Sequence, residues 1–92
     1  MEFEPAVKAI RQTYKVLSGK SEAEVILTYK GTEYGVTQPW HIKVENREAR
    51  HETHIGAANM LLEILKKELN DKVLSAEREA VALRKALNGL GN

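Results

Sequence analysis

Residues 55–90 read IGAANMLLEILKKELNDKVLSAEREAVALRKALNGL, and this stretch decides the fold class. Its apolar residues recur at steps of three and four, the spacing that puts side chains on one face of an α-helix. The first repeat consists of Ile55, Ala58, Leu62, Leu65 and Leu69, and the second consists of Val73, Ala76, Ala80, Leu83, Leu87 and Leu90. The C-terminal half is therefore predicted to be amphipathic helix, leucine-rich at first and then rich in alanine and valine.

The two repeats fall out of step between Leu69 and Val73, where one four-residue step follows another. A turn at Asn70-Asp71 would give a helical hairpin, with helices over 47–69 and 72–88, and polar residues there can cap the second helix. An unbroken helix with a stutter is the alternative, because the junction contains no glycine or proline. The capping residues lead us to favour the turn, and the alternative stays open.

The N-terminal segment 1–19 also carries the signals of a helix. Pro5 suits a first turn and Gly19 suits a C-cap. One apolar face is formed by Phe3, Ala6, Val7, Ile10, Tyr14 and Leu17. A basic stripe of Lys8, Arg11 and Lys15 occupies another face, which we expect to point into solvent.

Residues 22–45 change to a period of two, which is typical of antiparallel β-strands. The first strand ends at Lys30-Gly31, which suits a hairpin turn, and Glu33–Thr37 is predicted to form the return strand. Residues 40–45 alternate again. Pro39 cannot donate a hydrogen bond to a strand ladder, so it marks either a bulge in one long strand or a turn before a third strand.

These segments predict the architecture of the chain. Asn46 is a suitable N-cap for the helix over 47–69. We expect a small single α+β domain in the order α-β-β(-β)-α-α, in which helices pack on an antiparallel β-hairpin sheet. It ends in a helical hairpin or in one long bent helix. A chain of 92 residues closes one core and no second one.

The composition excludes several classes of protein. The chain has no cysteine, so neither disulfides nor a thiolate zinc site is available to it. Its 14 basic and 13 acidic residues are mixed along the sequence, and a net charge of +1 gives little support to a dedicated nucleic-acid binder. No apolar run is long enough for a membrane span, and the acidic N-terminus lacks a secretory pattern. We expect a cytoplasmic protein, in the host cytoplasm if it is viral.

A cluster of polar and aromatic residues suggests a ligand site where the strands meet the second helix. Its members are Tyr34, Trp40, His41, Arg47, Arg50, His51 and His54. Arginine binds phosphate or carboxylate bidentately, and aromatic rings stack on bases. We expect a small anionic or nucleotide ligand here, weighed against structural roles in which Trp40 anchors the core and the arginines pair with glutamates.

No catalytic motif is present in the sequence. It has no cysteine nucleophile, no glycine-rich phosphate loop and no nucleophile elbow, so we do not expect an enzyme. Glu48 and His51 have the E-x-x-H spacing of helical metal ligands, but metal sites of this kind need several such pairs. Neither a metal nor a cofactor is therefore predicted.

The segment Arg50-His51-Glu52-Thr53-His54, followed by Ala57-Ala58 and Leu61-Leu62, resembles the last helix of a double-stranded-RNA-binding domain. That family opens this helix with lysines and then packs small residues and leucines on its sheet, in an α-β-β-β-α order. Histidines and one arginine take the place of the lysines here. The resemblance implies a nucleic-acid-binding module, which is the alternative function.

The leading hypothesis is a non-enzymatic binding protein that self-associates into a dimer or a higher homo-oligomer. The expected interface is the second apolar repeat, formed by Val73, Ala76, Ala80, Leu83 and Leu87, because small side chains let another helix approach closely. Small intracellular chains often act as accessory regulators or inhibitors, and phage-encoded host-modulating factors are familiar examples. By that analogy we expect the chain to bind a host protein or to sequester the anionic ligand.

Overall fold

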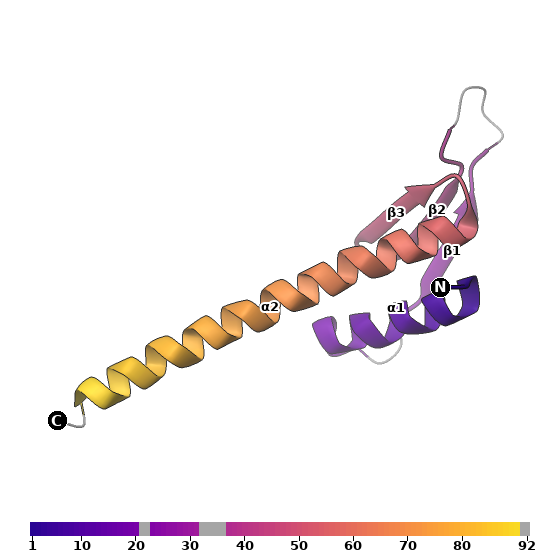
Figure 1. Cartoon of the computed structure of the whole chain (residues 1–92). Coiled ribbons are helices and arrows are strands. Elements are labelled where there is room, and N and C mark those ends of the chain that lie inside the picture. The colour runs from indigo at the N-terminus through magenta and orange to yellow at the C-terminus, as the bar shows by residue number, and fades with distance from the viewer. Residues whose placement is uncertain (21–22, 32–36, 91–92) are drawn as a thin grey trace.

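The computed structural model describes residues 1–20, 23–31 and 37–90, in which a helix is followed by three strands and a second helix (Figure 1). The elements are α1 (Phe3–Ser18), β1 (Val25–Tyr29), β2 (Trp40–Val44), β3 (Arg47–His51) and α2 (His54–Leu90). This arrangement confirms the small α+β domain that the sequence predicts.

Helix α1 packs through the apolar face that the sequence indicates. Ala6, Ile10 and Tyr14 on this face are buried. Gly19 ends the helix in the left-handed region at φ 76°, where a residue without Cβ is unstrained. Its N–H donates to the carbonyl oxygen of Lys15 at 2.8 Å, which satisfies one of the free carbonyls at the helix end. α1 therefore occupies the region in which the N-terminal helix is predicted.

The three described strands form an antiparallel sheet in the order β1-β2-β3. Leu27 of β1 lies opposite Ile42 of β2, which in turn lies opposite Ala49 of β3. Because side chains alternate along a strand, these three share one face of the sheet. Both helices pack against that face, and no described element covers the other, on which Lys43 is exposed (Figure 1).

The connection between β1 and β2 lies mostly outside the described residues. The return strand predicted over Glu33–Thr37 falls there, apart from Thr37 itself. The described partner of β1 is β2, and the N–H of Lys30 donates to the carbonyl oxygen of Pro39 at 2.7 Å, which extends their pairing. Pro39 stands directly before β2, at a strand start where the missing N–H is tolerated.

The prediction that a helix begins after Asn46 is wrong. Residues 47–51 form β3, and the turn at Glu45 and Asn46 joins this strand to β2. The sequence of β3, REARH, is rich in helix formers, but each of its residues pairs with a residue of β2 and Ala49 is buried in the core. Tertiary pairing outweighs local propensity in this segment.

Helix α2 begins instead at His54. The hydroxyl of Thr53 accepts a hydrogen bond from the N–H of Gly56 at 2.9 Å, so Thr53 is the N-cap. Gly56 is needed in this first turn, because a Cβ at its position would lie 2.1 Å from Nδ1 of His51. The start of α2 is thus fitted closely around the end of β3.

Helix α2 runs unbroken to Leu90, so the favoured turn at Asn70-Asp71 and the separate helices over 47–69 and 72–88 are wrong. The continuous helix, which was the alternative, is present. The junction contains no residue that interrupts the helical hydrogen-bond ladder, and a hairpin would need a free apolar surface for its second arm to cover. The first part of α2 already packs on α1 and the sheet.

The core lies between the sheet, α1 and the first part of α2. Its buried apolar residues are Ala6, Ile10, Tyr14, Ile42, Val44, Ala49, Ala57, Ala58, Leu61, Leu62 and Leu65. Residues 70–89 of α2, here called the projecting segment, are all exposed and extend past the rest of the domain (Figure 1). The molecule consequently measures 69 × 27 × 22 Å.

Candidate functional site

The residues predicted to bind a ligand are divided between the two faces of the sheet. The strand register puts Trp40, Arg47 and His51 on the face that the helices cover, and His41 and Arg50 on the open face. The two arginines therefore point to opposite sides, whereas a shared anion site needs them on one side. Tyr34 lies outside the described residues.

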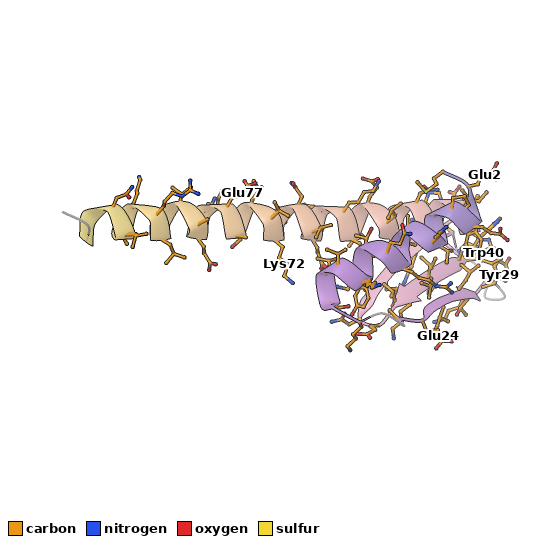
Figure 2. All side chains as sticks on the ribbon, turned by 90° about the horizontal axis from the view of Figure 1, so that it is seen from below. Glu2, Glu24, Tyr29, Trp40, Lys72 and Glu77 are labelled. Carbon is orange, nitrogen blue, oxygen red and sulfur yellow. The ribbon has the colours of Figure 1, made fainter. Side chains whose placement is uncertain are left out.

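Trp40 and His54 belong to a row of rings at the end of the domain where α2 begins. The ring centroid of Trp40 is 4.8 Å from that of Tyr29 and 5.4 Å from that of His54. His54 in turn lies 5.1 Å from Phe3 in an edge-to-face contact. Figure 2 shows Trp40 and Tyr29 together at this end. The row links α1, β1, β2 and α2, so these rings stabilise the fold through contacts with one another.

Arg47 connects β3 to α2. Its Nε donates to both carboxylate oxygens of Glu68, at 3.1 and 3.3 Å, and its Nη2 lies 3.1 Å from one of them. The guanidinium also lies 5.7 Å from the ring centroid of Tyr14. The hydrogen bond to Glu68 raises the pKa of Arg47. Arg47 therefore ties β3 to α2, and its charge is already paired with that of Glu68.

The open face of the sheet carries a smaller group around Glu48. Arg50 Nε donates to Glu48 Oε1 at 3.1 Å, and Nδ1 of His41 lies 4.0 Å from the same oxygen. The hydrogen bond from Arg50 lowers the pKa of Glu48. Arg50 and His41 therefore converge on a carboxylate of their own chain. The pair of Arg50 and Glu48 is exposed, and exposed pairs contribute little to stability.

His51 serves the turn between β3 and α2. Its Nδ1 accepts a hydrogen bond from the N–H of Thr53 at 3.3 Å. Glu48 and His51 are three residues apart in a strand, so they point to opposite faces of the sheet and do not form the helical pair that their spacing suggests. Within the described part of the chain, no three histidine, aspartate or glutamate side chains gather as metal ligands would.

A group that sequence reasoning missed holds the turn before β3. Glu45 has φ 51°, which is unusual for a residue with a side chain. The hydroxyl of Tyr14 donates to its carboxylate at 2.7 Å, and Lys20 Nζ lies 3.1 Å away. The bonds from Tyr14 and Lys20 lower the pKa of Glu45, and the bond to Glu45 raises the pKa of Tyr14. No local sequence signal connects positions so far apart in the chain.

The residues predicted to form an oligomer interface lie on the projecting segment. These residues, here called the apolar stripe, are Val73, Ala76, Ala80, Leu83 and Leu87. All are exposed, and Leu83 and Leu87 expose 70% and 68% of their surface. At about 100° per residue, the stripe falls on the same side of α2 as the buried Leu62 and Leu65. The face of α2 that covers the core therefore continues beyond the domain without cover from any described residue.

The boundary between the covered and uncovered parts lies at the end of α1. Lys72 Nζ donates to the carbonyl oxygen of Leu17 at 2.9 Å, and Figure 2 shows Lys72 where α2 passes this helix end. On the far side of the projecting segment, Leu74 and Val81 are also exposed, at 43% and 56%. Val81 lies about 160° around the helix from Leu83, so the two belong to different faces.

None of the described helices is both long and apolar enough to cross a lipid bilayer. No protein-family model matches the chain, and no curated protein or solved structure is significantly similar to it.

Proposed function

We propose that the chain is a non-enzymatic binding protein that self-associates through the apolar stripe of α2. One observation carries the proposal. The same face of α2 that buries Leu62 and Leu65 against the domain continues as Val73, Leu83 and Leu87, where nothing described in this chain covers it. An apolar helix face that is buried along its first half and exposed along its second half is typical of a surface that binds another chain.

The sequence of the stripe suits a helix as its partner. Val73, Ala80 and Leu87 take position a of a heptad repeat, and Ala76 and Leu83 take position d. Charged residues flank them at positions e and g, which are Lys72, Glu77, Glu79 and Arg84. Charges at these positions are typical of helices that pair in water. Ala76 and Ala80 let the partner helix approach closely.

The chain then acts as an accessory regulator or inhibitor in the cytoplasm, and phage-encoded factors offer the nearest analogy in size. Support comes from the absence of catalytic motifs in its sequence. Its target is a host protein or a small anionic ligand. With Arg47 already paired to Glu68, and with Arg47 and Arg50 on opposite faces, the protein target is the better fit.

Self-association is tested by sedimentation equilibrium of the whole chain and of two matched variants. Leu83→Ser changes the apolar stripe, and Val81→Ser makes a similar change to an exposed residue on another face. We expect the wild type and V81S to approach the mass of two or more chains as concentration rises, and L83S to remain monomeric. A wild type that stays monomeric up to about 1 mM, where even an association of about 4 kcal/mol is detected, would contradict the proposal.

The alternative is a nucleic-acid-binding module. The observation in its favour is the order helix, three strands and helix, with both helices on one face of the sheet, because the α-β-β-β-α order is the one that the resemblance implies. Lys8, Arg11 and Lys15 are exposed on α1. However, residues 54–65 of α2 contain neither lysine nor arginine, and His54 is stacked on Phe3 and Trp40.

This alternative is tested by titrating double-stranded RNA at several salt concentrations. Phosphate binding weakens steeply with salt because counterions are released, so binding by Lys8 and Arg11 would fall about tenfold or more between 50 and 200 mM salt. A K8A/R11A variant would bind more weakly and with a shallower salt dependence. Binding that neither salt nor this variant changes would exclude the module.

A further inference from the structure

We propose that the partner of the apolar stripe is a second copy of this chain in antiparallel orientation, with Ala80 against the partner's Leu83 and Ala76 against the partner's Leu87. This inference rests on the proposed self-association and adds the direction and the register of the pairing. Side-chain sizes and the space around α2 support it, and the flanking charges are compatible with it.

Side-chain size is matched only in the antiparallel register. The stripe has its small residues, Ala76 and Ala80, towards the domain, and its large residues, Leu83 and Leu87, towards the tip. In antiparallel pairing each alanine faces a leucine, so the four layers at positions 76, 80, 83 and 87 have a similar volume. In-register parallel pairing would put alanine against alanine near the domain, where a gap would remain, and leucine against leucine at the tip.

The space around α2 favours the same orientation. Along residues 54–69, the side of α2 that bears the stripe is occupied by α1 and the sheet of its own chain. A parallel partner would bring its own domain into that space. In an antiparallel pair the apolar stripe of each chain lies wholly beyond Lys72, which marks the end of α1, so the two domains stay at opposite ends. The partner helix would thus cover the stripe from the point where α1 stops.

The flanking charges are compatible with this register. Glu77 faces the partner's Arg84, and by symmetry the pair forms twice. Glu79 lies near the partner's Ala86, so no like charges oppose each other among these positions. Charge does not exclude the parallel arrangement, in which Lys72 and Glu79 would meet the partner's Glu77 and Arg84. Side-chain size and the space around α2 favour the antiparallel orientation, and the flanking charges are compatible with it.

The proposed dimer carries its two domains at opposite ends. Two molecules of 69 Å that overlap along about 27 Å of helix would form a particle about 110 Å long. Its two sheets would be far apart, so each dimer would offer two separate binding surfaces to a target that occurs in pairs or in arrays. A parallel dimer would be little longer than one chain.

Cysteine cross-linking tests the orientation, because the natural sequence has no cysteine that could interfere. Glu77→Cys, Glu79→Cys and Arg84→Cys leave the apolar stripe intact and are made as separate variants, and tagged R84C is oxidised in a mixture with each of the other two. We expect R84C to form a disulfide with E77C several times faster than with E79C, because Glu77 faces the partner's Arg84 in the antiparallel register and Glu79 does so only in the parallel one. Small-angle X-ray scattering of the wild type should show a maximum dimension near 110 Å, as estimated from the helix rise.

The possible outcomes separate the two proposals. Faster linking of R84C to E79C than to E77C, or a dimer no longer than a single chain, would overturn the antiparallel orientation while self-association stands. A dimer by sedimentation in which neither pair cross-links would overturn the register. A wild type that sediments as a monomer would remove the self-association and this inference together.

Discussion

Leu65 and Leu83 lie on the same side of α2, yet the structure gives them opposite roles. Leu65 is 0% exposed in the core, whereas Leu83 is 70% exposed on the projecting segment. We therefore expect Leu65→Ala to destabilise the folded chain and Leu83→Ala to leave the isolated chain almost unchanged. The two substitutions remove the same atoms, so chemistry is held constant and only the surroundings differ.

The sizes of the two effects follow from burial. Removing a buried leucine side chain leaves a cavity and costs about 2–5 kcal/mol, which is a large part of the stability of a small domain and lowers the midpoint of thermal unfolding by about 8 °C or more. For Leu83→Ala, the change in the free energy of unfolding of the monomer is expected to stay within about 0.5 kcal/mol. If dimerisation buries both copies of Leu83, its loss removes about 3–6 kcal/mol, which weakens association by a factor of about 150 to 20,000.

Two assays separate these effects. Urea unfolding followed by circular dichroism, at a concentration low enough for monomers, measures the stability of each variant. Sedimentation equilibrium at higher concentrations measures association. The reasoning is refuted if L83A lowers the unfolding free energy of the dilute chain as much as L65A does, because the projecting segment would then have a partner within its own chain.

Three further predictions concern the ends of β3 and α2. Thr53→Ala removes the N-cap of α2 and should lower the free energy of unfolding by about 1 kcal/mol in urea titrations, whereas Thr53→Ser should restore most of it. Gly56→Ala places a Cβ 2.1 Å from the His51 ring, so thermal unfolding should shift to lower temperature, and the double variant with His51→Ala should recover part of the loss. Equal losses in the single and double variants would show that the ring is not the obstacle. The lowered pKa of Glu45 means that its contacts stabilise the fold above the unfolded-state pKa and are lost as pH falls through the folded-state value. Tyr14→Phe should therefore destabilise the chain at pH 7 and much less near pH 2 in urea titrations, and an equal effect at both pH values would contradict the role of Glu45.

The parts of the fold that could be predicted are those with one strong local period. The three-four spacing of Ala6, Ile10 and Tyr14 places the buried face of α1, and the two-residue alternation from Trp40 to Val44 identifies β2. Strand β3 could not be found in this way. Its residues REARH favour helix in isolation, and only pairing with β2 makes them a strand. That pairing is non-local information.

The non-local pairing of β3 also explains why the residues of the predicted ligand site are not gathered as expected. In the predicted helix, Arg47, Arg50 and His51 would lie on one side. In the observed strand they alternate between the two faces of the sheet, so the error in secondary structure also separates the residues of the predicted ligand site. Trp40 and His54, which the sequence predicts to lie together, are in contact. Their contact is part of the row of rings that stabilises the domain. The apolar stripe depends only on helical periodicity, and its five residues do lie on one exposed side of α2.

The exposure of the whole projecting segment also affects the stability of its helical conformation. Residues 70–89 have little but their own backbone bonds and neighbouring side chains to keep them helical, and isolated helices of this length are marginal in water. Coil-to-helix conversion and pairing would then be a single coupled equilibrium, so the ellipticity at 222 nm should rise with protein concentration. Ser75→Ala, away from the stripe, should tighten pairing only by favouring the helix. The affinity of this protein for itself would be set in part by residues that never touch the partner.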